Sequence, residues 1–408
     1  MLKNIKIGVF ISLVNILIQG VTLLFQNIIA NNLGIVNFGH FGVLQTDYTI
    51  FCAIADFGMM TLILAYFGKR ASEGSLFTNV LQLRLFMTLL SGIAMIAFAC
   101  LFRRNQPTFG GELILAAGLL FQHAFFDWYF ICGHFWKKLL ISKVLHTLSF
   151  TGIMTLCLYV FHFDSIPLIA LATVLAALPA FSFGVSQAFS LKIFRIRYQT
   201  FKFFKLMLKS ACPFAATSIA SFAYLPVGLY TISHVAPPEF LGAYNFSHRL
   251  MTLASSLMVY FIYSSVLTLH KSKQGQLSLR DQAIFTAFII AISSPLWLFP
   301  SWTLKIIFFA SPWTPDILQI SSQCLQILSF SLLFQAIRLG MISTLLKEKK
   351  TILYGIMISI GGLLNIAICS IGAKYVAPSL IPVLTLSGDF FLTLFLGCYF
   401  IKNRRFSW

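Results

Sequence analysis

Among the charged residues that interrupt apolar stretches of helix length, six are the best placed to do chemistry. They are three arginines and three aspartates: Arg84, Arg249, Arg338, Asp56, Asp127 and Asp389. A charged side chain inside a bilayer is costly and normally faces a bundle interior or a water-filled cavity. The simpler explanations are an arginine that extends to the lipid headgroups and an aspartate held in a structural ion pair.

Neutral polar residues recur with helical spacing in the same apolar stretches. One stripe follows a single face of the first stretch, at Asn15, Gln19, Thr22 and Gln26. Similar stripes occur later in the chain, at Thr217, Ser221, Tyr224 and Gly228, at Ser331, Gln335 and Arg338, and at Thr385, Asp389 and Thr393. Such stripes either join helices by hydrogen bonds or line an aqueous cleft. We interpret Asn15, Gln19, Gln26 and Gln335 as candidate cavity residues.

Motifs for catalysis, metal binding or cofactor binding are not apparent in the sequence. The histidines and cysteines lack metal-ligand spacing, and no glycine-rich phosphate loop or nucleophile elbow occurs. The whole chain has only 11 acidic residues. We therefore predict a protein that is not an enzyme and that needs no metal or cofactor.

The composition indicates a polytopic helical membrane protein. Of the 408 residues, 58% are hydrophobic and 10% are charged, whereas soluble domains have about a quarter charged residues. A membrane-spanning helix needs about 20 apolar residues. We predict twelve spans, near 7–30, 38–66, 76–102, 113–133, 141–162, 166–190, 209–233, 242–268, 283–308, 317–340, 350–372 and 376–401.

The segment 192–209 divides the predicted spans into two groups of six. It carries six cations and no acid: Lys192, Arg195, Arg197, Lys202, Lys205 and Lys209. Such a segment is stable in the headgroup layer and not in the hydrocarbon core. We therefore predict an N-terminal bundle over 1–191, a basic cytoplasmic hinge over 192–209, and a C-terminal bundle over 210–408.

Lysine and arginine alternate between connectors as topology signals do, so the net charge of +18 does not indicate a nucleic-acid partner. The connectors expected on the cytoplasmic side carry most of these cations. Arg103 and Arg104 are the exception, because they fall in a connector expected on the outer side. This alternation places both termini in the cytoplasm.

Four segments of the chain resemble the signatures of a known family. NNLGIVNFGHFG follows the first span, and ADFGM lies in the second. FFDWYFICGHFWKKLLISKV begins at Phe125, and PEFLGAYNFSHRL leads into the eighth span. In this order and with this spacing, which covers nearly the whole chain, they resemble the signatures of the Wzx-type O-antigen flippases, a family of the multidrug/oligosaccharidyl-lipid/polysaccharide exporter superfamily. Asn31 or Asn32 stands where the family often has an arginine.

The resemblance implies a V-shaped, MATE-like fold of two six-helix bundles around a cationic cavity. It also implies alternating access for an undecaprenyl-diphosphate-linked oligosaccharide, such as an O-antigen repeat unit of lipopolysaccharide, at the bacterial inner membrane. Arg84 and Arg249, one from each bundle, would bind the diphosphate, and Arg338 is a further candidate cavity residue. Asp56 and Asp389 would be candidates for carrying a coupling proton or sodium ion. Besides the lipid-linked glycan and membrane lipid, the expected partners are a glycan polymerase and chain-length machinery.

Two other functions are compatible with the sequence. A multidrug or metabolite cation antiporter of the same superfamily would use acids in its cavity, for which Asp56 and Asp389 are available. A membrane glycosyltransferase or polymerase is the enzyme alternative. The short connectors and the few acidic residues disfavour it.

The topology can be tested with single cysteines introduced into a cysteine-free background. Because the cation alternation predicts cytoplasmic connectors near positions 197 and 272, cysteines there should be protected from an impermeant thiol reagent in intact cells. Cysteines near positions 164 and 237 should be labelled. Labelling at position 197 would contradict the predicted orientation.

Overall fold

The computed structural model describes residues 2–59, 62–63, 74–122, 125–133, 135–161, 165–190, 201–269, 279–309, 314–348 and 350–402. Over these ranges the chain is helical and contains no strand. Seven of the described helices are long and apolar enough to cross a membrane, or up to nine if each of two bent pairs is one span. Many large apolar side chains on them are exposed, as lipid contact requires. The prediction of an all-helical, multi-pass membrane protein is confirmed.

The chain forms two compact units. The first contains residues 1–19, 26–42 and 220–408, and the second contains residues 20–25 and 43–219. The predicted bundle boundary at 192–209 stays a prediction, and residues 191–200 lie outside the described ranges.

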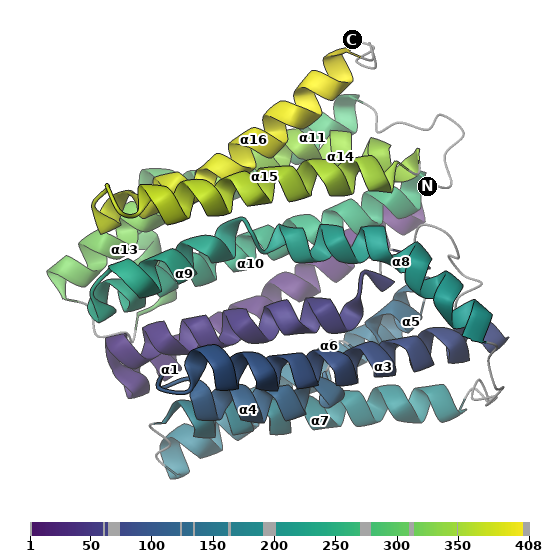
Figure 1. Ribbon diagram of the computed structural model, residues 1–408, viewed down its shortest axis with the longest axis horizontal. Helices are drawn as coiled ribbons and strands as arrows, with labels where there is room; N and C mark the ends of the chain where they lie inside the picture. The colour runs from purple at the N-terminus through teal and green to yellow at the C-terminus, as the bar shows by residue number, and fades with distance from the viewer. Residues whose placement is uncertain are drawn as a thin grey trace. The chain divides into compact units, whose positions relative to one another are not determined.

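The second unit contains the C-terminal part of α1 and the helices up to α8. Its elements are α3 (Gly74–Phe98), a π-helical turn (Ala99–Arg103), α4 (Phe109–Gly118), a 3-10 turn (Leu119–Phe121), α5 (Asp127–Cys132), α6 (Trp136–Thr155), a π-helical turn (Leu156–Val160), α7 (Ile166–Ser190) and α8 (Phe201–Ser221). Within it, α7 packs against both α4 and α6 (Figure 1). The predicted span 113–133 is broken here, because the helix ends after Phe121 and α5 begins only at Asp127.

The first unit contains the remaining helices. They are α9 (Leu225–Val235), α10 (Pro238–Leu269), α11 (Leu279–Leu298), α12 (Pro300–Ile307), α13 (Pro315–Leu328), α14 (Phe330–Lys347), α15 (Thr351–Gly372), a 3-10 turn (Pro378–Leu380) and α16 (Ile381–Lys402). Figure 1 shows α15 and α16 side by side, in agreement with their extensive contacts. The axes of α11 and α12 are bent by 99° relative to each other at the break between Leu298 and Pro300. The proline there cannot continue the preceding helix.

Helix α1 (Leu2–Asp56) contains a sharp break at Gly34. Gly34 has φ 70° and ψ 165°, a backbone conformation that is essentially restricted to glycine. The break falls between the predicted spans 7–30 and 38–66. The two predicted spans are therefore the two arms of α1.

The second arm of α1 crosses α10 at unusually short range in the first unit. A Cβ added to Gly39 would lie 2.8 Å from the backbone nitrogen of Gly242, and one added to Gly242 would lie 2.8 Å from the carbonyl carbon of Ile35. The amide of Asn245 donates a hydrogen bond to the carbonyl of Phe38 at 2.8 Å. The absence of a side chain at both glycines is thus a condition for this crossing.

Gly242→Ala should destabilise the protein, because a new methyl group would meet fixed backbone rather than a movable side chain. Overpacking of this kind costs about 1–3 kcal/mol. Gly397→Ala in α16 is the matched control, because nothing lies within 4 Å of a Cβ built there, and alanine favours a helix over glycine by about 0.5–1 kcal/mol. Thermal unfolding midpoints in detergent should therefore move in opposite directions, and equal midpoints for the two variants would contradict the close crossing.

Candidate functional site

Arg84 and Asp56 form an ion pair in the second unit. The Arg84 Nη2 atom lies 3.1 Å from Asp56 Oδ1, and the guanidinium carbon lies 5.1 Å from the centre of the Phe125 ring. Asp56 is the last residue of α1, which ends there because Phe57 and Gly58 adopt left-handed backbone conformations, with φ 47° and 66°. The pair is electrically neutral, and its aspartate side chain remains 23% exposed.

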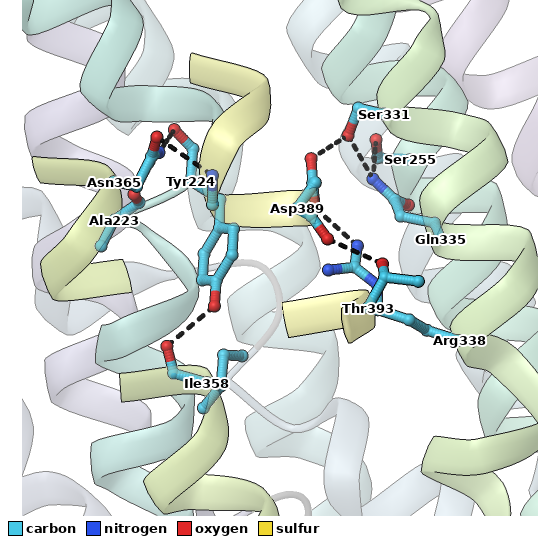
Figure 2. Close-up of polar contacts among 11 residues, drawn as sticks. Ala223, Tyr224, Ser255, Ser331, Gln335, Arg338, Ile358, Asn365, Asp389 and Thr393 are labelled. Atoms are coloured by element: carbon cyan, nitrogen blue, oxygen red, sulfur yellow. Dashed lines mark hydrogen bonds and ion pairs between the residues drawn. The ribbon is translucent and has the colours of Figure 1, made fainter. Parts of the chain in front are cut away.

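Arg338 and Asp389 form a second ion pair, in the first unit (Figure 2). Arg338 Nη2 on α14 lies 2.5 Å from Asp389 Oδ1 on α16, and both side chains are buried. The Ser331 hydroxyl donates to the other oxygen of Asp389, and the Gln335 amide donates to the hydroxyls of Ser331 and Ser255. The predicted polar faces of these two helices therefore contact each other through a hydrogen-bonded ion pair.

Arg249 differs from both of these arginines. It lies on α10, half-buried, and its Nη2 atom is 3.5 Å from the carbonyl oxygen of Gly42. Among the residues that the structure describes, no carboxylate lies within ion-pair distance of it, and its Nε atom has no hydrogen-bond acceptor. A carbonyl oxygen can accept a hydrogen bond but cannot neutralise a positive charge. Arg249 thus has unused capacity to bind an anion.

Two neighbours of Arg249 on α10 also have unused hydrogen-bonding atoms. Both ring nitrogens of His248 and the side-chain oxygen of Asn245 are buried and lack hydrogen bonds within the described ranges. The His248 ring stacks on Tyr244, with ring centres 6.1 Å apart. Unpaired buried polar groups are rare and call for an explanation, such as a bound water or ligand. The segment 245–249 of α10 is therefore the strongest candidate for substrate contact in the first unit.

The other predicted site residues are placed as follows. Gln335 belongs to the Asp389 network, and Gln26 is buried on α1. The side chains of Asn15 and Gln19 lie outside the described part of α1. Asp127 pairs with Lys143 at 2.5 Å. Whether the residues of the two units share one cavity stays a prediction.

The sequence reasoning missed a third buried cluster, formed by Arg103 with Asp47 and Glu112. It also explains the exception in the cation alternation. Arg103 is only 5% exposed and lies between two acids, so it is not a free cation at the headgroups. The signal that could have revealed this cluster was the placement of Arg103 in a connector expected on the outer side.

Asn365 was also missed, although it is the only amide side chain in the apolar helix α15. Its amide donates hydrogen bonds to the carbonyls of Ala223 and Tyr224, at 2.7 and 3.3 Å, where α8 and α9 are separated by a 47° bend (Figure 2). The Tyr224 hydroxyl donates to the carbonyl of Ile358 at 2.8 Å. The bond to Ala223 supplies a partner to a backbone carbonyl at the break in the helix.

Comparison of the chain with known proteins relates it to one protein family. A family model described as polysaccharide biosynthesis protein matches residues 5–267. No curated protein sequence matches the chain.

The chain is similar in fold to solved transporters. The lipid II flippase MurJ in an inward closed conformation superposes with a TM-score of 0.75 at 15% identity, covering 97% of this chain and 87% of that one. An inward-facing multidrug resistance MATE family transporter of the MOP superfamily has a TM-score of 0.68 at 14% identity, covering 97% and 100%. A MOP superfamily transporter from Pyrococcus furiosus has a TM-score of 0.67 at 14% identity, covering 98% and 95%. The predicted MATE-like fold is confirmed.

The ion pair of Arg338 and Asp389 should behave as a buried unit. Arg338→Met should lower the thermal unfolding midpoint strongly, since removing one partner of a buried pair costs about 3–5 kcal/mol. Adding Asp389→Asn to Arg338→Met should recover part of the loss, because no charge is then left buried.

The half-exposed pair of Lys350 and Glu348 provides the control. Lys350→Gln should change the free energy of unfolding by less than about 1 kcal/mol. A double variant at Arg338 and Asp389 that is no more stable than Arg338→Met alone would show that the pair is not a coupled unit.

Proposed function

Because the chain belongs to the polysaccharide biosynthesis protein family, we propose that it is a flippase for polyprenyl-diphosphate-linked oligosaccharide. The family match and the fold shared with a lipid II flippase and with MATE transporters support a transporter of this superfamily. Within this proposal the substrate is an O-antigen or similar repeat unit on undecaprenyl diphosphate. It crosses the inner membrane by alternating access.

The chemistry of such a substrate sets three requirements. Its apolar tail can remain in lipid, its sugars need neutral polar contacts, and its diphosphate needs compensating positive charge. Arginine suits a diphosphate better than lysine, because its planar guanidinium donates several hydrogen bonds in a fixed geometry.

The observation that carries the proposal is the charge state around Arg249. Its guanidinium is half-buried, contacts a backbone carbonyl at 3.5 Å, and has no carboxylate partner in the described part of the chain. An incoming phosphate would supply the missing negative charge. Asn245 and His248 offer hydrogen-bonding atoms one turn and one residue before it on the same helix.

Arg84 and Arg338 take a second role in the proposal, since each already has an aspartate partner. Either arginine could exchange its carboxylate for a phosphate during transport, which would release Asp56 or Asp389 to bind a coupling ion. A cation-exporting function is less well supported, because both aspartates are occupied by guanidinium groups. The glycan polymerase and chain-length partners and the cytoplasmic termini remain predictions.

The test is flipping of a lipid-linked oligosaccharide in proteoliposomes that contain the purified protein. Arg249→Ala should lower the rate at least about tenfold, which corresponds to about 1.4 kcal/mol. Arg249→Lys should recover part of the rate, because lysine keeps the charge and loses the planar geometry.

Lys374→Ala is the control, since this exposed cation lies beyond the end of α15. The rate of this variant should equal that of the wild type. A wild-type rate in Arg249→Ala would overturn the proposed role of Arg249. Absence of flipping by the wild type, with export of organic cations instead, would overturn the proposed function.

A further inference from the structure

Helix α12 is short and runs across the direction of the helix that precedes it. It has 8 residues, and its axis is bent by 99° from that of α11. Eight residues of α-helix are only about 12 Å long, whereas the hydrocarbon core of a bilayer is roughly 30 Å thick. Helix α11 has 20 residues, and a helix of that length is about 30 Å long. We therefore expect the membrane span to end with α11, so that α12 is a separate element.

Local contacts within the first unit fix the direction of α12. The Thr303 hydroxyl lies 3.1 Å from the carbonyl oxygen of Pro295, in the last turn of α11, and 2.9 Å from that of Phe299, in the break. Phe308, directly after α12, is fully buried and packs on Phe246 of α10 with ring centres 4.8 Å apart. Helix α12 also packs against α13. One side of α12 is thus held by protein.

The other side of α12 is apolar and exposed. Trp302 and Ile306 lie one turn apart on this side, and Phe299 and Phe309 flank the helix. These four side chains are 52% to 70% exposed. Lys305, also exposed, lies on the same turn as Trp302 and Ile306. Exposed apolar surface with a polar rim marks a site of interaction.

The residue types and the position of this surface indicate lipid as its partner. Tryptophan is enriched at the level of the lipid headgroups because its ring is amphipathic, and lysine near a helix end extends its amine to the same level. The surface adjoins Leu298, the exposed last residue of α11, so it continues the lipid-facing surface of that span. On the predicted topology α12 lies on the outer side of the membrane, as do the exposed Lys374 and Tyr375 after α15.

We propose that α12 is an interfacial helix that binds the outer surface of the lipid bilayer. Trp302, Ile306 and the two flanking phenylalanines enter the boundary between headgroups and acyl chains, and the Lys305 amine faces the lipid phosphates. This contact fixes the level at which the outer end of α11 sits in the membrane. The proposal concerns the first unit only and does not depend on which substrate the protein carries.

Quenching of tryptophan fluorescence by brominated lipids tests the proposal in proteoliposomes. The emission of Trp302 is the difference between the emission of the wild type and that of Trp302→Phe. This difference should lose most of its intensity when bromine is on the acyl carbons nearest the headgroup, and less when bromine is near the chain end. Trp128→Phe is the control, because this indole is fully buried and its emission should be insensitive to either lipid.

The role of Lys305 can be measured with the same fluorophore. Replacing neutral lipid by anionic lipid should draw the Lys305 side of α12 closer to the bilayer and shift the Trp302 emission to shorter wavelength. This shift should be lost in Lys305→Gln and kept in Lys374→Gln, which removes an exposed cation elsewhere. An equal shift in Lys305→Gln would overturn the contact between Lys305 and the lipid phosphates.

Three outcomes would overturn the assignment of α12 to the interface. Strongest quenching by bromine at the chain end would place α12 inside the hydrocarbon core. Quenching of Trp302 by aqueous acrylamide, with no quenching by either brominated lipid, would place the surface in water. A dimer that is detected by native mass spectrometry and is dissociated by Trp302→Phe would assign the surface to a second copy of the chain.

Discussion

A buried charge must be balanced, and this constraint organises the polar interior of the described chain. Arg84 and Arg338 are each balanced by one aspartate. Arg103 faces two acids, and Arg249 faces none among the described residues. In a soluble protein such differences could be absorbed by water and salt, but an apolar environment makes each surplus charge costly. The positive charge of Arg249, which no carboxylate of the described residues balances, therefore points to an anion.

The spans were predictable from the sequence because length and hydropathy alone decide whether a segment can cross a bilayer. Their interruptions were less predictable. The break at Gly34 coincides with a gap between two predicted spans, since glycine there adopts a conformation closed to other residues. The break after Ser221 falls inside the predicted span 209–233. Its stabilising partner, Asn365, is more than a hundred residues away in the chain, so no local pattern reveals it.

The candidate site was predictable as a set of faces and not as a set of contacts. Periodicity placed Gln335 and Arg338 on one helical face and Asp389 on another, but it contains no information on which face opposes which. The pairing of Arg338 with Asp389 depends on the packing of α14 against α16, which only the structure provides. Glu112 was overlooked because it lies just outside the predicted span 113–133, and Asp47, although inside the predicted span 38–66, had no partner that the sequence could identify.

The crossing of α1 and α10 connects these electrostatic features to the backbone. Two of the segments that resemble flippase signatures meet there: Gly39 and Gly42 from the first contact Gly242 and Asn245 from the second. Because Gly42 has no side chain, the Asn245 side chain can pack directly on it. The Arg249 guanidinium, one turn further along α10, lies 3.5 Å from the carbonyl oxygen of Gly42. This contact orients the arginine without neutralising it. The same close packing that fixes the two helices thus leaves one oriented positive charge available for an anionic group.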